Sequence, residues 1–268
     1  MPELPEVETI RRQLEPLIVG RQFLGAWAHE SDKFRLGPEA IGSTVESLAR
    51  RGKYLIGRLD DDRELIVHLG MTGSLRLRRP EHADDPYVRA WWTLSDGEVL
   101  EFRDVRRFGR IAVVPTGAYG TLPTLAALGP EPWDDAFSAA HLWGSVKRSN
   151  RAVKTLLLSQ RVVAGVGNIY ADEALWLAGV HPASRSISRA RAAAMRDAVR
   201  AVLSDGLDHG GTTLRDYVDV AGESGSNQHH LRCYGRSGEP CERCGTLLRH
   251  SVIDARTSTW CPSCQRRR

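Results

Sequence analysis

The first nine residues, Met1-Pro-Glu-Leu-Pro-Glu-Val-Glu-Thr9, place a potential amine nucleophile beside two carboxyl groups. If methionine aminopeptidase removes Met1, Pro2 becomes a secondary amine close to Glu3 and Glu6. With Met1 attached, the Pro2 nitrogen is an amide and is not nucleophilic. Proline and acidic residues are also favoured in the first turn of a helix, where the missing N–H costs little and the helix dipole stabilises negative charge. The segment therefore indicates either an active site or an ordinary helix start.

Four cysteines form two C-x₂-C pairs, Cys241/Cys244 and Cys261/Cys264, with sixteen residues between the pairs. This spacing can place four thiolates tetrahedrally around Zn²⁺ and leaves no open coordination position, which is typical of a structural site. A redox role is the weaker alternative, because both pairs lie in a short, turn-rich segment. We expect the fifth cysteine, Cys233, to be a small buried hydrophobe.

Two turn-like segments could bind phosphate groups. Residues 247–260, between the cysteine pairs, can form a hairpin on which Arg256 presents its planar guanidinium. The alternative for Arg256 is a solvent-exposed charge. Gly165-Val-Gly-Asn168 can direct backbone amides and the Asn168 side chain at an anion from a helix N-terminus. The alternative is a helix–helix turn in which the glycines supply positive φ.

Two further segments combine a flexible apolar side chain, an arginine and an aromatic ring: His68-Leu-Gly-Met71-Thr-Gly and Asp104-Val-Arg106-Arg-Phe108-Gly. An enzyme that acts on one nucleic-acid base must take it out of the stack and fill the space with apolar or guanidinium groups. The alternative is that Met71 and Phe108 are core residues.

The apolar spacing predicts the elements that hold these groups. Apolar residues recur at intervals of three and four over residues 4–19, which predicts an amphipathic helix with Glu3 and Glu6 at its start. Short segments rich in Val, Ile, Leu, Tyr and Trp follow, and their spacing suggests a β-sandwich or barrel. The predicted strands cover residues 53–59, 64–69, 88–94, 99–103 and 111–114. Beyond a break at residues 128–133, helices are predicted at residues 152–158, 169–177 and 188–203, the last with Ser188 as N-cap.

The charge distribution suits a polyanionic partner. The chain has 268 residues and a net charge of +4. Residues 225–268 contain eight Arg and no Lys against three acids, a net charge of +5, and basic residues also cluster at 50–53 and 103–110. A solvated charged surface is the alternative for any single cluster. No apolar run approaches the roughly 18 residues of a membrane span, and no signal-peptide pattern is present, so we expect a cytoplasmic protein without a membrane partner.

Together these segments resemble bacterial formamidopyrimidine-DNA glycosylases. The matching motifs follow the family order over nearly the whole chain. They are residues 1–9, Arg51-Gly-Lys53-Tyr, His68-Leu-Gly-Met71-Thr-Gly, Arg106-Arg-Phe108-Gly, Leu128-Gly-Pro-Glu-Pro, Val166-Gly-Asn168-Ile-Tyr-Ala-Asp-Glu173, Gly210-Gly-Thr-Thr, Tyr234-Gly-Arg and the cysteine pairs.

The resemblance implies an α+β fold that clamps double-stranded DNA. The expected parts are an N-terminal catalytic β-sandwich domain, a linker, a helix-two-turns-helix domain and a zinc-finger hairpin that holds one structural Zn²⁺. Their expected boundaries are 1–127, 128–134, 135–224 and 225–268. The resemblance also implies a monomer that associates with the bacterial nucleoid through DNA.

The resemblance implies a role for each matching residue. Pro2 would attack C1′ of the damaged nucleotide, Glu3 would act as acid and base, and Glu6 would support proton transfers. Lys53 and Arg256 complete the expected catalytic set, and both would grip phosphates together with Asn168. The expected DNA-binding residues are His68, Met71, Arg106, Phe108, Lys154, Asn168, Tyr170 and Arg256. Among them Met71, Arg106 and Phe108 would fill the space left by the flipped nucleotide.

Two departures from the family pattern bear on the expected activity. Val105 stands where relatives usually have proline. Ser226 and Asn227 stand where relatives usually carry an aromatic residue, in a loop that caps the flipped base in the family. We expect a bifunctional DNA glycosylase/AP lyase that removes oxidised purines such as 8-oxoguanine and formamidopyrimidines. The alternatives are an oxidised-pyrimidine glycosylase of the endonuclease VIII type and a non-catalytic protein that binds lesions.

Overall fold

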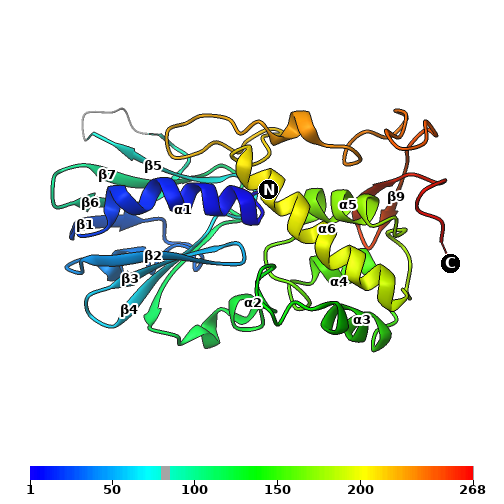
Figure 1. Cartoon of the computed structure of the whole chain (residues 1–268). Coiled ribbons are helices and arrows are strands. Elements are labelled where there is room, and N and C mark those ends of the chain that lie inside the picture. Colours follow the sequence, from blue (N-terminus) through cyan, green and yellow to red (C-terminus); the bar gives the residue numbers. More distant parts are fainter. Residues whose placement is uncertain (80–84, 268) are drawn as a thin grey trace. The chain divides into compact units, whose positions relative to one another are not determined.

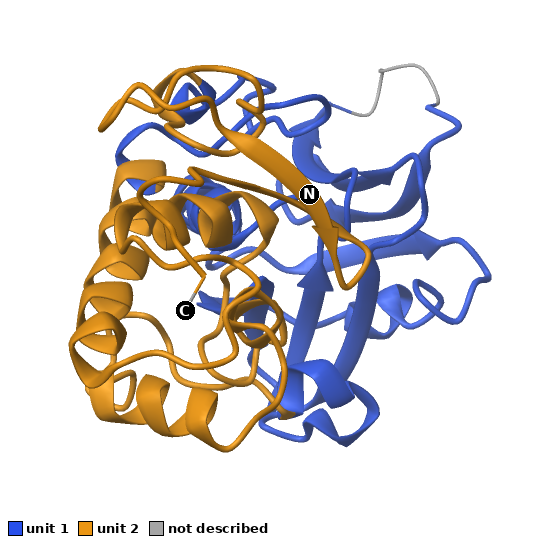
Figure 2. Cartoon of the chain, turned by 90° about the vertical axis from the view of Figure 1, so that its right-hand side faces the viewer, with its two compact units in different colours: residues 1–126, 207–228 blue, residues 127–206, 229–268 orange. Residues whose placement is uncertain are grey.

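The computed structural model describes residues 1–79 and 85–267, which form two compact units (Figure 2). The first unit consists of Met1–Ala126 and Leu207–Gln228. The second consists of Ala127–Gly206 and His229–Arg268. The expected α+β fold, with β-sheets in the N-terminal part, helices after them and a C-terminal hairpin, is confirmed. The expected four-part domain division stays a prediction.

Helix α1 (Leu4–Ile18) confirms the amphipathic helix predicted near the N-terminus. Its buried face, which includes Val7, Ile10 and Leu14, contributes to the core of the first unit. Figure 1 shows α1 lying alongside the strands of this unit. Because the helix begins directly after Glu3, its packing on the core fixes the position of the residues at its N-terminus.

Two four-stranded antiparallel sheets enclose the core of the first unit. The sheet orders are β1-β6-β7-β5 and β2-β3-β4-β8 (Figure 1). The strands are β1 (Phe23–Ala28), β2 (Val45–Arg51), β3 (Tyr54–Leu59), β4 (Arg63–His68), β5 (Gly73–Arg78), β6 (Val88–Leu94), β7 (Val99–Asp104) and β8 (Arg110–Pro115). The short helices of this unit are η1 (Gly37–Ala40), η2 (Tyr119–Thr121), α2 (Pro123–Ala126) and η3, whose range Asn227–His230 extends into the second unit.

All five predicted strands are confirmed, as β3, β4, β6, β7 and β8, with ends that agree within one residue. Strands β1, β2 and β5 were not predicted. Arg and Ser residues dilute the apolar alternation in β2 and β5. In β1 the pairing register with β6 shifts between Phe23 and Gly25, so a regular alternation is interrupted there.

The second unit is helical and ends in a hairpin. Its helices are α3 (Ala139–Lys147), α4 (Val153–Leu158), α5 (Asn168–Leu177) and most of α6 (Arg189–Asp208), and the hairpin pairs β9 (Arg249–Ile253) with β10 (Arg256–Trp260). The predicted helices at 152–158, 169–177 and 188–203 are confirmed, although α6 is longer, and the predicted hairpin within residues 247–260 is also confirmed. Ser188 is the predicted cap, because its hydroxyl accepts a hydrogen bond from the Arg191 N–H at 3.2 Å. Helix α3 was not predicted.

The fully buried Trp92 on β6 ties the core to η1, because its indole N–H donates to the Gly37 carbonyl at 2.9 Å. Replacing Trp92 with phenylalanine leaves that carbonyl without this donor and opens space in the core. We expect Trp92→Phe to lower the free energy of unfolding by about 2 kcal/mol in urea titrations. The matched control is Trp27→Phe, at an exposed position on β1, with an expected change within about 0.5 kcal/mol. Equal losses in the two variants would contradict this assignment.

Candidate active site and nucleic-acid interface

The N-terminal cluster is buried and internally hydrogen-bonded. Pro2 is buried next to Glu3, which is the N-cap of α1. The Glu3 backbone N–H donates to Oε2 of Glu6 at 2.7 Å, which is half of a capping box. Both Glu3 and Glu6 are only 1% exposed. The helix-start interpretation is therefore correct as local structure, but two carboxyl groups are buried here where an ordinary helix start could leave them in water.

A second segment of the first unit holds the same Glu6 carboxylate. The Thr212 backbone N–H donates to Oε1 of Glu6 at 2.7 Å. Gly211 makes this approach possible, because its φ is +90° and an added Cβ would lie 2.9 Å from Cγ of Glu6. Each oxygen of Glu6 thus accepts a backbone hydrogen bond, one from each segment. These bonds favour the charged form of a buried carboxylate and fix its orientation.

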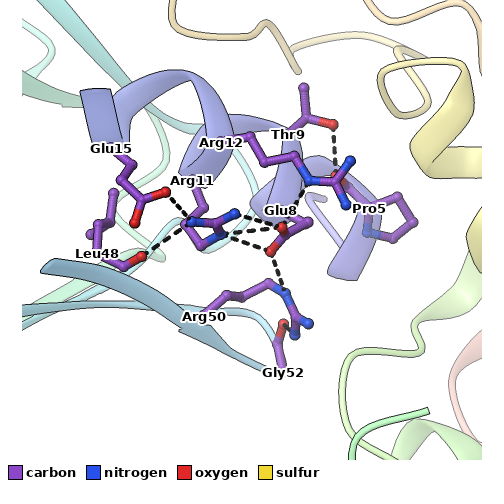
Figure 3. Close-up of polar contacts among 9 residues, drawn as sticks. All are labelled: Pro5, Glu8, Thr9, Arg11, Arg12, Glu15, Leu48, Arg50 and Gly52. Carbon is purple, nitrogen blue, oxygen red and sulfur yellow. Dashed lines mark hydrogen bonds and ion pairs between the residues drawn. The ribbon is translucent and has the colours of Figure 1, made fainter. Parts of the chain in front are cut away.

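A cluster of charged side chains connects α1 to the turn that carries Lys53 (Figure 3). Glu8 accepts hydrogen bonds from Arg11 at 3.1 Å, Arg12 at 2.9 Å and Arg50 at 3.1 Å. Burial opposes the charge on Glu8, but the arginine hydrogen bonds lower its pKa below the ordinary value. Sequence reasoning missed Glu8. The basic run at residues 50–53 was a signal that an acid elsewhere in the chain could bind it.

Arg50 extends this connection to the turn itself. Its guanidinium also donates to the Gly52 carbonyl at 3.1 Å (Figure 3). Gly52 has a φ of +56° in the turn between β2 and β3, and the next residue, Lys53, is buried. The predicted catalytic residue Lys53 is therefore positioned from α1 through Glu8 and Arg50. Its contact with phosphate stays a prediction.

His68 ends β4 opposite Tyr54, and the ring centroids are 4.6 Å apart. Burial and the positive charge of Lys53 lower the pKa of His68 to about 4, against a smaller opposite effect of Asp104. The imidazole is therefore neutral near pH 7. Its Nδ1 accepts the Gly70 N–H at 3.2 Å, so the side chain also shapes the loop that follows.

The two loops with Met71, Arg106 and Phe108 are fastened together. The hydroxyl of Thr72 donates to Asp104 at 2.5 Å and accepts the Arg106 N–H at 3.0 Å. The other Asp104 oxygen accepts the Gly109 N–H at 2.7 Å. The backbones also meet closely, since a Cβ on the residue at position 70 would lie 2.4 Å from the nitrogen of position 109.

The side chains of these loops differ in exposure. Phe108 is 48% exposed, so its interpretation as a core aromatic is wrong. The guanidinium of Arg106 lies 4.9 Å from the centre of the Phe108 ring, within cation–π range. Met71 is half-buried. The two joined loops thus hold two apolar side chains and one cationic side chain close together. The space-filling role of Met71, Arg106 and Phe108 stays a prediction.

In the second unit, Gly167 is the N-cap of α5 and Asn168 is its first residue. The preceding turn is held by Gln160, whose amide oxygen accepts the Gly165 N–H at 2.9 Å and whose amide nitrogen donates to the Val166 carbonyl at 2.5 Å. Gly165 supplies positive φ, at +86°, as the alternative interpretation of this turn requires. Within the described chain, Oδ1 of Asn168 is buried and has no hydrogen-bond partner. The anion-binding role of this turn stays a prediction.

Tyr170 and Lys154, two predicted DNA-binding residues, lie inside the second unit. Tyr170 is buried against α6, where an added Cβ at Gly206 would lie 2.5 Å from the tyrosine hydroxyl. Lys154 is 1% exposed, forms an ion pair with Asp172 at 2.6 Å and donates to the Thr257 carbonyl at 2.9 Å. Lys154 therefore joins α4 to α5 and β10. Direct contacts of both residues with DNA stay predictions.

Two adjacent acids on α5 hold the C-terminal segment in place. Asp172 accepts the Thr259 N–H at 2.9 Å, and burial raises its pKa to about 6 despite the lowering effect of Lys154. Glu173 accepts backbone N–H groups from residues 232, 233 and 234. Sequence reasoning gave Asp172 no role, because its partners Lys154 and Thr259 lie on other elements and no local pattern pairs them with it.

Arg256 is exposed at the start of β10, directly after the hairpin turn. The turn residues Asp254 and Ala255 have φ values of 46° and 61°, as a two-residue type I′ hairpin turn requires. The Thr155 hydroxyl donates to the Asp254 carboxylate and so fixes the turn to α4. The predicted rigid presentation of Arg256 is therefore present in the structure, whereas its contact with phosphate stays a prediction.

The cysteine residues fit a structural zinc ion. The four Sγ atoms of Cys241, Cys244, Cys261 and Cys264 lie within 4.8 Å of one another, and tetrahedral zinc with 2.3 Å bonds places thiolates about 3.8 Å apart. The Trp176 indole N–H donates to Sγ of Cys241 at 3.4 Å, an outer contact that orients this ligand.

The remaining cysteine, Cys233, is buried as predicted. Its thiol lies 3.1 Å from the Thr259 carbonyl oxygen, to which it donates a hydrogen bond. Burial raises the pKa of this thiol above its ordinary value.

Family models match three consecutive parts of the chain. The formamidopyrimidine-DNA glycosylase N-terminal domain covers residues 1–111, the H2TH domain of the same family covers residues 128–218, and a zinc finger found in FPG and IleRS covers residues 238–267. The chain belongs to the formamidopyrimidine-DNA glycosylase family. The family resemblance of the sequence motifs is thereby confirmed, and the zinc-finger match together with the four clustered thiols confirms the predicted structural zinc site.

Full-length relatives support the same family assignment. The chain is 43% identical to the formamidopyrimidine-DNA glycosylase of Deinococcus radiodurans, over 99% of this chain and 97% of that protein. It resembles the crystal structure of the MutM (Fpg) protein from Thermus thermophilus with a TM-score of 0.92 and 41% identity, over all of both chains. A Lactococcus lactis Fpg mutant in complex with Fapy-dG containing DNA matches with a TM-score of 0.90 and 33% identity, over 99% of this chain and all of that one. Among the described residues, no helix is long and apolar enough to span a membrane.

Removing one zinc ligand tests the metal site. We expect the purified chain to contain one Zn²⁺ and Cys261→Ser to lose it, because a three-thiolate site binds the ion far more weakly. Metal content measured by atomic emission checks this expectation. The control is Cys233→Ser, which should keep a full equivalent of zinc because Cys233 lies outside the cluster. Equal zinc content in the wild type and Cys261→Ser would contradict the assignment.

Proposed function

We propose that this chain is a bifunctional DNA glycosylase/AP lyase that removes oxidised purines from duplex DNA. The observation that carries the proposal is the buried Glu3–Glu6 pair beside Pro2 in a member of this family. A family relative was solved with Fapy-dG containing DNA, and we infer the same class of substrate for this chain. The protein would act as a monomer in the cytoplasm, on the DNA of the bacterial nucleoid.

The nucleophile in this proposal is the amine of Pro2 after removal of Met1. An α-amino group has a reference pKa of about 7.7–8.0, roughly two and a half units below that of lysine, so an appreciable fraction is unprotonated near pH 7. Met1 is exposed, which gives an aminopeptidase access to it. The chain contains only four lysines as competing amines: Lys33, Lys53, Lys147 and Lys154.

The amine forms a bond to C1′ of the nucleotide while the bond from C1′ to the base breaks, and the base leaves with a proton. Opening of the sugar ring then yields an iminium ion between the proline nitrogen and C1′. The iminium acidifies the C2′ protons, so that loss of a proton expels the 3′ phosphate and a second elimination expels the 5′ phosphate. Water finally hydrolyses the iminium and returns the free amine.

Proton transfers accompany each of these steps. Glu3, adjacent to the nucleophile, is the residue we assign to deliver and remove these protons. Glu6 supports the transfers from a fixed position, because its oxygens accept the N–H groups of Glu3 and Thr212. Together the two carboxyl groups supply the acid/base function that a pure DNA-binding protein does not need.

The other predicted residues would bind DNA around the reacting nucleotide. Lys53, Asn168 and Arg256 would contact phosphates, and His68, Tyr170 and Lys154 would lie close to the bound strand or support groups that do. The exposed pair of Arg106 and Phe108, together with Met71, would fill the space left by the flipped nucleotide.

The residue at position 227 favours a second candidate function, a preference for oxidised pyrimidines. It stands where relatives usually have an aromatic residue, is only 4% exposed and donates from Nδ2 to the Thr212 hydroxyl at 2.8 Å. The loop therefore lacks an aromatic surface at this position. Excision rates on duplexes with 8-oxoguanine, a formamidopyrimidine or an oxidised pyrimidine distinguish the two preferences.

Borohydride trapping on a duplex with one 8-oxoguanine tests the function. We expect the processed wild type to excise the base, to cleave the strand and to form a covalent protein–DNA adduct on reduction. Pro2→Gly changes the secondary amine to a primary one in a less constrained chain, so we expect at least tenfold slower excision and adduct formation. Ala201→Gly, at an exposed position on α6, serves as the control for handling of the variant proteins. Tight binding without excision or adduct would favour the non-catalytic alternative, and full excision by Pro2→Gly would contradict the role of Pro2.

A phosphate contact by Arg256 predicts a change in salt dependence. Each phosphate that the protein neutralises contributes about 0.9 to the slope of log affinity against log salt concentration. We expect Arg256→Ala to weaken binding to all sequences and to reduce the slope by about 1, measured by fluorescence anisotropy between about 50 and 200 mM salt. The matched control is Arg249→Ala, at an exposed arginine on the other strand of the hairpin. An unchanged slope for Arg256→Ala would exclude a phosphate contact.

A further inference from the structure

Helix α1 contacts a single stretch of the first unit at both ends of that stretch and, through the Tyr217 hydroxyl, at the Glu6 carbonyl at 3.5 Å. We call residues 212–220 the docking segment. Glu6 contacts its first residue, and Gln13, seven residues further along α1, contacts its last two. Residues seven apart lie on the same side of a helix, about 10 Å from each other along the axis. Residue Glu6 belongs to the proposed active site, whereas Gln13 lies two turns away from it.

The contact at Gln13 uses both atoms of its side-chain amide. Nε2 donates to Oδ2 of Asp219 at 2.7 Å, and Oε1 accepts the Val220 N–H at 3.0 Å. The second oxygen of Asp219 accepts the Glu223 N–H at 2.8 Å, and the Asp219 N–H donates to the Glu223 carbonyl at 2.9 Å. Gln13 therefore holds a turn that hydrogen bonds between Asp219 and Glu223 close.

The interior of the docking segment connects its two ends. The buried Tyr217 hydroxyl donates to the Gly210 carbonyl at 3.0 Å. The Thr213 hydroxyl donates to the Tyr217 carbonyl at 2.9 Å and accepts the Gly225 N–H at 3.0 Å. The intervening residues Leu214, Arg215 and Asp216 are exposed. A movement of Asp219 would thus displace Tyr217 and Thr213, and through them Thr212, which binds Glu6.

Glycines with positive φ flank this arrangement. Gly210 and Gly211, just before the segment, have φ values of +68° and +90°, and Gly222, just after it, has +86°. Because glycine adopts these and many other backbone conformations at little cost, the segment can move about both ends when a contact with α1 is lost. The contacts with α1 at Glu6 and Gln13, together with the burial of Tyr217 in the core, restrict that movement.

We propose that Gln13 is a positioning residue for the reaction: by holding Asp219 and Val220 it keeps the docking segment on α1 and the Thr212 N–H on Glu6. The inference rests on the proposed function for its catalytic consequence. When the Gln13 contact is broken, the segment leaves α1 for part of the time. During that time Glu6 loses the Thr212 N–H as a donor, and its carboxylate loses the fixed orientation from which it supports proton transfer. Gln13 itself does not contact the substrate.

Two substitutions that exchange the amide of Gln13 and the carboxylate of Asp219 test the contact. Gln13→Glu keeps an acceptor for the Val220 N–H but places a carboxylate against Asp219, so the pair repels. Asp219→Asn in the same protein replaces that repulsion by an amide that can donate to the new carboxylate. The double variant is therefore expected to restore the contact that Gln13→Glu breaks. The matched control is Gln22→Glu, on a part-exposed glutamine of the first unit whose amide donates to the Gly42 carbonyl at 2.7 Å.

The first measurement follows the docking segment without reference to activity. Release of the segment makes the chain around the exposed Arg215 a better substrate for trypsin, and mass spectrometry identifies the cut after Arg215 among others. We expect Gln13→Glu to speed this cleavage about tenfold, the effect of losing roughly one hydrogen bond, and the double variant and Gln22→Glu to match the wild type. A cleavage rate unchanged in Gln13→Glu would overturn the proposal that Gln13 holds the segment.

The second measurement is single-turnover excision of 8-oxoguanine with protein in excess. We expect Gln13→Glu to slow the rate at saturation about tenfold, with DNA affinity within about twofold of the wild type, and the double variant to recover the rate. Faster trypsin cleavage with an unchanged excision rate would overturn the link to Glu6. Loss of affinity with an unchanged rate at saturation would also overturn it. A wild type that does not excise would refute the proposed function, whereas the trypsin result would still decide whether Gln13 holds the segment.

Discussion

The structure of the first unit depends on the buried carboxylate of Glu6. A carboxyl group buried to this extent is stable only when hydrogen bonds replace its lost hydration, and here the backbone N–H groups of Glu3 and Thr212 donate two of them. One donor belongs to the start of α1 and the other to the segment that follows α6. Gly211 has to be glycine for this approach, since a Cβ would collide with the Glu6 side chain. The carboxylate therefore ties the proposed nucleophile at residue 2 to a segment more than two hundred residues away.

Buried acids hold irregular backbone in the same way at two other places that carry predicted functional residues. Asp104 accepts hydrogen bonds from both loops that carry the predicted space-filling residues. Asp172 and Glu173 on α5 accept backbone N–H groups of the C-terminal segment, which carries Arg256 and the zinc ligands. Each acid sits on or at the end of a helix or strand and replaces missing backbone partners in a loop. Loops fixed in this way keep their side chains in position before a substrate binds, which reduces the reorganisation needed for reaction.

Local sequence patterns predicted most of the regular elements and the metal site but missed most of the supporting contacts. Helix α1 and strand β6 were predicted almost to the residue, because their apolar periodicity is strong. Strands β2 and β5 were not predicted, because charged residues interrupt the alternation of apolar and polar residues. Lys154 was expected at the DNA, and only the folded chain shows its hydrogen bond to the Thr257 carbonyl, more than one hundred residues away along the chain. Such pairings depend on which distant segments meet, and one sequence carries no periodic signal for them.

The most direct test of the account is the location of the covalent bond. A borohydride-reduced complex of the protein with 8-oxoguanine duplex can be digested with trypsin and nuclease, and the peptide that carries the sugar remnant can be sequenced by mass spectrometry. We expect the remnant on the nitrogen of Pro2, in the peptide of residues 2–11, and we expect this peptide to lack Met1. A remnant on Lys53, Lys154 or another lysine, or on a chain that retains Met1, would contradict this expectation.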